Sequence, residues 1–262
     1  MEKLPFENVF MHGVRVERTS KAGALDFICR RLGEEGAGLP LAVFTPNAEI
    51  VCRCAKDSRL CGLINSSDIS LPDGAGVVWA ASLLGSQLPG RIPGIELGEA
   101  VLGWCAENRI GVYLLGGRAG VAEEAALRLS DRFSGLEVLG THHGYFDTSG
   151  PENQKILSQI AGLKPGVLVV CLGFPRQEEW IISNRRELTG VKVMMALGGS
   201  LDVWAGRVRR APGFLRSAGF EWLWRVTTQP TRIVRTASLM SFVGLTLRER
   251  RRIQHAGEPP LL

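Results

Sequence analysis

The sequence predicts an α/β fold: a mostly parallel, doubly wound sheet of about six strands, with helices on both faces and a basic helical appendage at the C-terminus. Six short apolar runs each end in a polar or glycine-rich loop, and helical segments separate them. The runs are too uniformly apolar for a sheet with one face in water, which favours a sheet covered on both sides.

The elements follow in a regular order. Residues 8–17 alternate around Gly13 and predict a short hairpin, and a helix is expected from there to about Arg31. The expected strands of the sheet are residues 41–44, 69–71, 112–115, 136–139, 167–172 and 193–197. No internal repeat or low-complexity segment interrupts this pattern.

A doubly wound sheet binds its ligands beyond the carboxyl ends of its strands. The loops expected at that edge are all small or polar: residues 45–47, 72–74, 116–117, 142–145, 173–177 and 198–202. The sequence therefore predicts one ligand crevice lined by six loops.

Charge divides the chain into two parts near Gly206. Residues 207–252 hold eleven arginines, no lysine and two acidic residues, a formal charge of +9, while the rest of the chain holds 20 basic and 24 acidic residues, or −4. We expect residues 1–206 to form a catalytic core and residues 207–262 an appendage. Arginine mixed with tryptophan and leucine is typical of a segment on an anionic membrane, and equally of an arginine clamp for phosphate. A solvated basic helix is the third interpretation.

The remaining composition limits the compartment and the function class. No apolar run approaches the roughly 20 residues that span a bilayer, and the N-terminus lacks the pattern of a signal peptide. We therefore expect a cytoplasmic protein, peripheral on the inner face of the membrane. The six cysteines lack the spacing of a complete metal cluster and are expected to be reduced, buried thiols.

Two loops at the predicted crevice carry residues with more than one interpretation. Gly116 and Gly117 lead from a strand into a helix, where glycine lets backbone N–H groups approach a phosphate, but they equally suit a tight packed turn. Asp73 follows a strand between proline and glycine. Its carboxylate could act as a general base toward a sugar hydroxyl, or cap the helix expected from about Ala75, and residue type alone does not decide between them.

Absent motifs exclude several mechanisms. The chain has no D-x-D pair for a divalent metal on a sugar diphosphate, and no G-x-S-x-G, H-E-x-x-H or P-loop motif. A departing diphosphate would then be stabilised by arginines and helix N-termini. His142 and His143 are adjacent on a segment expected to be extended, so we expect their side chains to point to opposite sides, with one able to line the crevice, and no metal site.

The loop sequences together resemble one family. TPNAE, LPDGAGVVWA, GRIPGIEL, LLGGRAGVAE, GTHHGYFD, CLGFPRQEEWI, LGGSLDVWAGRVRRAP and FEWLWR are similar, in order and from about Asn8 to Arg235, to motifs of the WecG/TagA/CpsF glycosyltransferases. The resemblance implies a Rossmann-like fold. It also implies metal-independent, inverting transfer of N-acetylmannosamine, its uronic acid or a related sugar from a UDP donor to a polyprenyl-diphosphate-linked GlcNAc acceptor, with no cofactor.

The resemblance also implies roles for individual residues. Asp73 matches the general base, Thr45 and Asn47 lie near the reacting sugar, and Arg91 and Gln177 match two further active-site positions. Asp202, and less directly Tyr145, would contact the nucleoside of the UDP-sugar. From their position after a strand, Gly116 and Gly117 are also expected to bind the UDP-sugar donor. In the appendage, the matching arginines expected to contact the acceptor diphosphate are Arg225, Arg232 and Arg235.

Other functions compete with this hypothesis. A UDP-hexose or UDP-hexuronate donor would suit the same mechanism, and the sheet would also permit a nucleotide-dependent oxidoreductase, although the glycine motif departs from G-x-G-x-x-G. The pI of about 9.1 suggests nucleic acid, but an arginine, tryptophan and leucine tail on an acidic body fits an anionic inner leaflet better. The sequence leaves open whether the chain forms a homo-oligomer.

Overall fold

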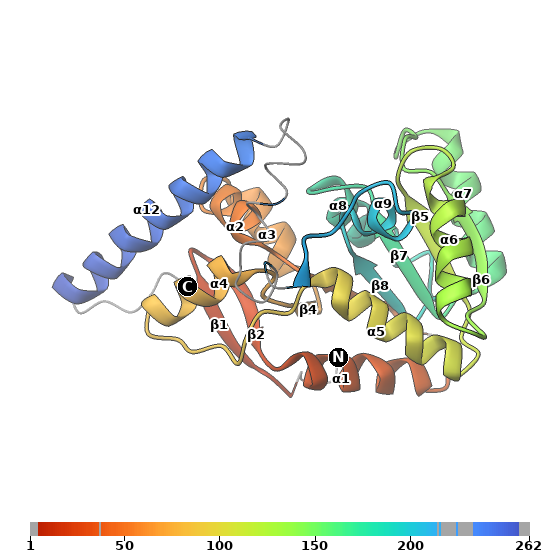
Figure 1. The fold of residues 1–262 in the computed structure, drawn as a ribbon, viewed down its shortest axis with the longest axis horizontal. Helices are drawn as coiled ribbons and strands as arrows, with labels where there is room; N and C mark the ends of the chain where they lie inside the picture. Colours follow the sequence, from red (N-terminus) through yellow and green to blue (C-terminus); the bar gives the residue numbers. More distant parts are fainter. Residues whose placement is uncertain (1–4, 37, 214, 216–223, 225–232, 257–262) are drawn as a thin grey trace.

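The computed structural model describes residues 5–36, 38–213, 215, 224 and 233–256. Figure 1 shows helices on both sides of a central sheet, with one long helix at the C-terminal end of the chain. The sheet has six strands in the order β4-β3-β8-β7-β5-β6, and every neighbouring pair is parallel. The predicted doubly wound α/β fold is confirmed.

The predicted hairpin is confirmed as β1 (Glu7–Met11) and β2 (Val14–Arg18), which form a separate antiparallel sheet. The turn contains only His12 and Gly13, and both have positive φ, 51° and 81°. Two consecutive positive φ values are typical of a tight hairpin turn that matches the twist of the strands. Helix α1 (Lys21–Gly33) follows, with the Ser20 hydroxyl accepting a hydrogen bond from the backbone N–H of Gly23 at its N-terminus.

The six predicted strands are all present. The strands are β3 (Leu41–Phe44), β4 (Ile69–Ser70), β5 (Val112–Gly116), β6 (Val138–His142), β7 (Val167–Cys171) and β8 (Val193–Ala196). The expected range for the fourth strand, 136–139, was wrong by two residues at its start and three at its end. Leu136 is buried in the core but precedes the strand. It is apolar because its side chain packs in the core, and it does not pair with a neighbouring strand.

Successive residues of the strands serve two separate cores. Ala42, Leu168 and Met194 point into one cluster, while their neighbours Val43 and Val169 point into the other. The first cluster is covered by side chains of α2 (Ala48–Cys54), α3 (Ser58–Asn65), α4 (Ala75–Leu83), α7 (Pro151–Leu163) and α8 (Arg176–Asn184). The second is covered by α1, α5 (Gly94–Glu107), α6 (Val121–Arg132) and α9 (Ser200–Trp204). Burial on both faces explains why the strand sequences are continuously apolar.

The hairpin also fixes the edge of the main sheet through a buried carboxylate. Glu17 is fully buried, and its Oε2 accepts a hydrogen bond of 2.5 Å from the backbone N–H of Ser70 in β4. The guanidinium of Arg15 lies 3.2 Å from the other carboxylate oxygen and donates to the carbonyl of Ser67. Since Asp73 follows β4 by three residues, this network holds the strand end that carries Asp73.

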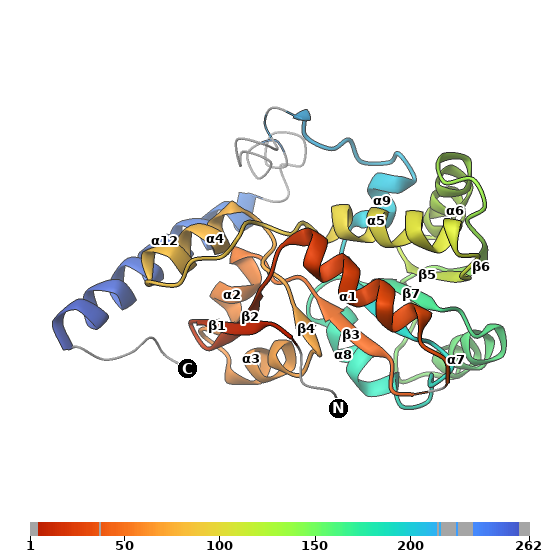
Figure 2. The ribbon, with the colours of Figure 1, turned by 90° about the horizontal axis from the view of Figure 1, so that it is seen from below.

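The long C-terminal helix α12 (Ile233–Ala256) packs on α2 and α4, and the views in Figures 1 and 2 agree on this arrangement. The buried Nδ1 of His12 in the hairpin turn contacts the carboxylate of Glu249, and its Nε2 lies 3.1 Å from the Thr246 hydroxyl. Phe242 is fully buried in the first core cluster. The helix expected in the basic segment is therefore present, and its buried side is joined to the N-terminal hairpin.

Two further expectations concern the cysteines and the membrane. The six cysteines are free thiols, four of them buried, and burial raises the pKa of Cys54 and Cys105 to about 12.

Among the described residues, no helix is long and apolar enough to cross a membrane.

Truncating Phe242 should strongly destabilise the docking of α12. Phe242→Ala removes a fully buried ring and is expected to cost about 3–5 kcal/mol of unfolding free energy. Urea denaturation measures this loss. Met240→Ala on the same helix is the control, because Met240 is 70% exposed and should change stability by less than about 0.5 kcal/mol. Equal effects of the two substitutions would contradict the docking described above.

Candidate active site

A cavity of about 550 Å³ opens at the carboxyl edge of the sheet. All six loops that follow the sheet strands contribute lining residues, as the sequence predicted. Seven of the predicted site residues line it: Thr45, Asn47, Asp73, Gly117, Tyr145, Gln177 and Asp202. The parallel sheet thus brings together residues that are up to 157 positions apart in the sequence.

Asp73 lies half-buried in the cavity wall, beyond the end of β4. Its backbone N–H donates to the carbonyl of Pro46 at 3.1 Å, which ties the β4 loop to the β3 loop. The N-cap residue of α4 is Gly74, with a φ of 97°, and it makes no side-chain capping hydrogen bond. Of the two interpretations of Asp73, the helix cap is therefore excluded, and its carboxylate remains at the cavity.

The β3 loop places two polar side chains beside Asp73. Asn47 caps α2, its Oδ1 accepting a hydrogen bond of 3.1 Å from the backbone N–H of Ile50. The side chain of Thr45 is close to the first residue of α5: a Cβ added at Gly94 would lie 2.7 Å from the Thr45 hydroxyl oxygen. Glycine at position 94 therefore lets the N-terminus of α5 approach Thr45 at the cavity.

Gln177 connects two loops of the site. Its Oε1 accepts hydrogen bonds from the backbone N–H groups of Gly173, at 3.2 Å, and Gly198, at 3.1 Å. Its Nε2 donates to the carboxylate of Glu178 at 2.9 Å, and both side chains are buried. Gln177 thereby fixes the loops after β7 and β8 relative to each other. Burial raises the pKa of Glu178 to about 7.

The two glycines after β5 occupy different positions. A Cβ at Gly116 would lie 2.3 Å from the carbonyl oxygen of Cys171, so only glycine permits this close packing of the β5 end on β7. Gly116 is not among the described lining residues, whereas Gly117 is. The Gly117 carbonyl accepts a hydrogen bond of 2.7 Å from the N–H of Gly144, which joins the β5 and β6 loops.

The Tyr145 side chain is 70% exposed at the cavity, on the loop that follows β6. Arg176, at the start of α8, donates to the carbonyls of Gly144 and Phe146 on either side of it. The Arg176 guanidinium also lies over the Phe146 ring, 5.2 Å from its centroid. An arginine from the β7 loop therefore sets the position of the loop that carries Tyr145.

The charged side chains of the lining are more often positive than negative. It includes five arginines and three carboxylates: Arg53, Arg118, Arg176, Arg209, Arg210, Glu49, Asp73 and Asp202. The first residues of α5 and α8 also line the cavity, and helix N-termini present backbone N–H groups and a positive partial charge. The arginines and helix N-termini of this wall suit a phosphate or diphosphate. The carboxylates are the groups in the wall that can accept a proton.

Some predicted residues lie elsewhere. Arg91 is half-buried three residues before α5 and is not among the described lining residues. Arg225 and Arg232 lie outside the described residues, and of Arg235 only its place in the backbone of α12 is described.

Sequence reasoning missed Arg53, whose guanidinium lies 4.6 Å from the centroid of the Phe174 ring in the cavity wall. It also missed Glu178 as the partner of Gln177. The sequence signal for Arg53 was weak, because it lies in a helix and not in a strand-end loop.

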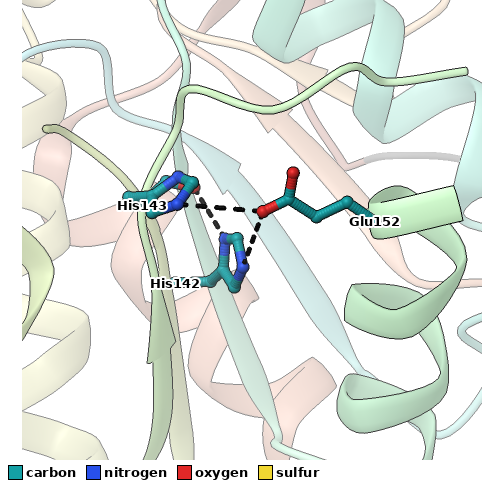
Figure 3. A group of neighbouring side chains, drawn as sticks. All are labelled: His142, His143 and Glu152. Carbon is teal, nitrogen blue, oxygen red and sulfur yellow. Dashed lines mark hydrogen bonds and ion pairs between the residues drawn. The ribbon is translucent and has the colours of Figure 1, made fainter. Parts of the chain in front are cut away.

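The histidine pair departs from the expected arrangement. Figure 3 shows the rings of His142 and His143 on the same side of the chain, both facing Glu152 in the first turn of α7. The expectation of opposite sides was wrong because β6 ends at His142, so the alternation of a strand does not extend to His143. Neither histidine is among the described residues that line the cavity.

Comparison with known proteins identifies the family. Residues 9–256 match the model of the glycosyl transferase WecG/TagA/CpsF family. The chain belongs to this family. It is therefore a glycosyltransferase, and the resemblance found in its loops is confirmed.

Curated relatives agree. The chain is 37% identical over 216 residues to the N-acetylglucosaminyldiphosphoundecaprenol N-acetyl-beta-D-mannosaminyltransferase of Staphylococcus aureus strain MRSA252, covering 82% of this chain and 83% of the relative. The protein of the same name from strain NCTC 8325 / PS 47 is 36% identical over the same coverage.

The buried carboxylates of this glycosyltransferase make its stability depend on pH. Glu178 and Glu17 each have a pKa raised from 4.5 to about 7 by burial. Between these values the folded state binds more protons than the unfolded state, so the free energy of unfolding should fall as the pH rises from about 4.5 to 7. Each carboxyl would contribute on the order of 3 kcal/mol to this fall.

Glu178→Gln keeps an oxygen that accepts from Gln177 but cannot ionise. We expect it to remove about half of the fall in stability, measured by urea denaturation at a series of pH values. Glu187→Gln is the control, because Glu187 is exposed just beyond the end of α8 and should leave the pH profile unchanged. A wild-type profile in Glu178→Gln would show that Glu178 is already ionised well below pH 7.

Proposed function

We propose that this glycosyltransferase transfers N-acetylmannosamine from UDP to the GlcNAc of a polyprenyl-diphosphate-linked acceptor, in the synthesis of a cell-surface polysaccharide or teichoic acid. The observation that carries the proposal is the half-buried Asp73, which lines a cavity together with five arginines and two helix N-termini. A base and a diphosphate-binding wall thus share one cavity. The names of the staphylococcal relatives supply the acceptor and the sugar.

The proposed chemistry is a single displacement. The acceptor hydroxyl oxygen attacks the anomeric carbon, its proton passes to the carboxylate of Asp73, and the bond from the anomeric carbon to the UDP oxygen breaks with its electron pair leaving on UDP. One displacement inverts the anomeric configuration. Thr45 and Asn47 lie beside Asp73 and would orient the sugar, while Asp202 and Tyr145 would contact the nucleoside.

The proposal assigns stabilisation of the leaving diphosphate to the protein and not to a metal. Arg53, Arg118 and Arg209 line the cavity, and the first residues of α5 and α8 also line it. Donors fixed before the reaction stabilise developing negative charge without reorganisation. Arg91, close to α5 in sequence, would act at the same site. The acceptor diphosphate is a separate group, and we assign its binding to Arg225, Arg232 and Arg235 of the appendage.

The structure also supports a peripheral position on the anionic inner face of the membrane. Trp79 on α4, and Met240 and Leu247 on α12, are large apolar side chains that are 40%, 70% and 41% exposed. The helices that carry them pack side by side (Figure 2). Exposed arginines lie near the C-terminal end of α12: Arg248, Arg250 and Arg251. Apolar side chains beside arginines favour binding to an anionic lipid surface, where the polyprenyl acceptor is held.

A UDP-release assay tests the function directly. The full chain is supplied with polyprenyl-diphosphate-linked GlcNAc and, separately, with UDP-N-acetylmannosamine, its uronic acid, or a UDP-hexose, all in the presence of EDTA. We expect release of UDP with the first donor. Preference for the uronic acid or a hexose would correct the sugar, activity only after addition of a divalent metal would reject the metal-independent mechanism, and no transfer with any donor would reject the proposal.

Asp73→Asn should lower turnover by about 10²- to 10⁴-fold, the usual contribution of a positioned base. The amide is nearly isosteric, so folding and binding of UDP, measured by thermal denaturation and calorimetry, should be close to those of the wild type. Asp147→Asn, in a loop outside the cavity lining, is the control and should keep full turnover. Near-normal turnover in Asp73→Asn would place the base elsewhere.

The arginines of the appendage should separate catalysis from recruitment. Reversing Arg225, Arg232 and Arg235 to Glu should reduce turnover even with a short, water-soluble acceptor, because these residues are proposed to contact the diphosphate. Replacing Arg248, Arg250 and Arg251 with Gln should weaken binding to anionic vesicles by roughly 1 kcal/mol per residue and spare the soluble assay. If both sets affected only vesicle binding, the clamp would be disproved.

A further inference from the structure

We propose that His142, His143 and Glu152 form a binding site for a divalent transition-metal ion of the Zn²⁺ class, outside the catalytic cavity. His142 is the last residue of β6, His143 follows it, and Glu152 is in the first turn of α7. The site would join the end of a strand to the start of the next helix, across the loop that carries Tyr145.

The three side chains already converge on one point. The Nε2 atoms of His142 and His143 lie 3.6 Å and 3.8 Å from the same carboxylate oxygen of Glu152 (Figure 3). One potential ligand atom from each residue lies within 4.8 Å of the other two. Bonds of about 2.0–2.2 Å to a shared zinc ion would separate the ligand atoms by roughly 3.3 Å. The two distances to Glu152 exceed this by only a few tenths of an ångström, and the two histidine nitrogens, which lie within 4.8 Å of each other, would have to approach to the same separation.

The hydrogen bond of His142 fixes which nitrogen is presented. Its Nδ1 lies 2.8 Å from the carbonyl oxygen of His143. A carbonyl can only accept, so Nδ1 carries the hydrogen and the neutral ring turns the lone pair of Nε2 toward Glu152. A lone pair and a carboxylate oxygen repel unless a cation lies between them. Donation of the remote ring N–H to a backbone carbonyl is also the usual way in which proteins orient a metal-binding histidine.

His143 needs one rearrangement. Its Nδ1 accepts a long hydrogen bond of 3.3 Å from the backbone N–H of Tyr145, which in the neutral ring places the hydrogen on Nε2. To bind a metal through Nε2, the ring must carry its hydrogen on Nδ1 and give up this contact. The bond lost is weak by its length, and the loop is still held by Arg176 through the carbonyls of Gly144 and Phe146.

The surroundings suit a bound ion with water completing its coordination. The three side chains are 23%, 32% and 45% exposed, so the ion would have access from solvent and open coordination positions. The Phe146 ring packs edge-on against His142, with the ring centroids 5.6 Å apart. Two imidazoles and one carboxylate are ligands that Zn²⁺ and its neighbours in the first transition row prefer, and Mg²⁺ and Ca²⁺ do not.

The position of the site gives it a structural role and not a part in transfer. Neither histidine lines the cavity among the described residues, whereas Gly144 and Tyr145, which follow them, do. The bound ion would fasten the β6 loop to α7 and stabilise the folded state by mass action. The ion itself takes no part in the proposed sugar transfer, and turnover in a metal-free assay does not test whether the ion binds.

Binding of Co²⁺ and Zn²⁺ to the full chain, first treated with chelator and reductant, tests the site. We expect calorimetry to show one equivalent of Zn²⁺ bound, Co²⁺ to give visible d–d absorption without a sulfur-to-metal band, and Zn²⁺ to raise the midpoint of thermal unfolding. His142→Gln, His143→Gln and Glu152→Gln should each weaken binding by at least about tenfold. His255→Gln, at the exposed C-terminal end of α12, is the control and should bind as the wild type does.

Three outcomes would overturn the site. The first is no binding by the wild type below roughly 100 μM, a level at which a built zinc site would be filled. The second is unchanged binding in all three variants, and the third is a sulfur-to-Co²⁺ band that persists in them and points to the cysteines. If His142 and Glu152 are joined by a proton and bind no metal, the experiment would give the first outcome. Unfolding midpoints of the metal-free variants equal to that of the wild type would exclude misfolding as the cause of weaker binding.

Discussion

The site depends on the parallel direction of all six strands of the sheet. Parallel strands deliver every carboxyl end to the same edge, so six loops distant in sequence meet around one cavity. The loops are then tied to one another by hydrogen bonds: Asp73 to Pro46, Gly144 to Gly117, and Gln177 to both Gly173 and Gly198. A shift of one loop would disturb its neighbours, which gives the cavity wall the rigidity that fixed polar donors require.

Buried polar groups hold the frame on which these loops rest. Glu17 and Glu178 are both buried carboxyls, and burial raises the pKa of each to about 7. Each one accepts a hydrogen bond next to the site: Glu17 from the N–H of Ser70, before Asp73, and Glu178 from the amide of Gln177. The two buried carboxyls thus lower the stability of the folded state at neutral pH, and their hydrogen bonds fix the geometry beside the cavity.

The C-terminal helix α12 is packed into the folded molecule and also carries a charged surface. Phe242, Thr246 and Glu249 face the core side of α12, and His12 at the tip of the N-terminal hairpin pairs with two of them. The opposite side carries Met240, Leu247 and exposed arginines. One helix therefore joins the two ends of the chain and presents the surface proposed to meet the membrane.

The sequence by itself determined the strands, the helices between them, the six loops at one edge and the family. These features follow from apolar runs and motifs formed by residues that are neighbours in sequence, so they can be predicted without knowing which distant residues are in contact. The start of β6 was misplaced because Leu136 is apolar for packing and not for pairing.

Only the tertiary structure decided the rest, because it depends on contacts between residues far apart in sequence. Gly74, and not Asp73, caps α4, so the Asp73 carboxylate stays at the cavity. Gln177 joins two loops through a hydrogen bond to a residue 21 positions away. His142 and His143 face Glu152 together because β6 ends at His142. The end of a strand is set by its pairing with the neighbouring strand, so the sequence could not show that the alternation of side chains stops there.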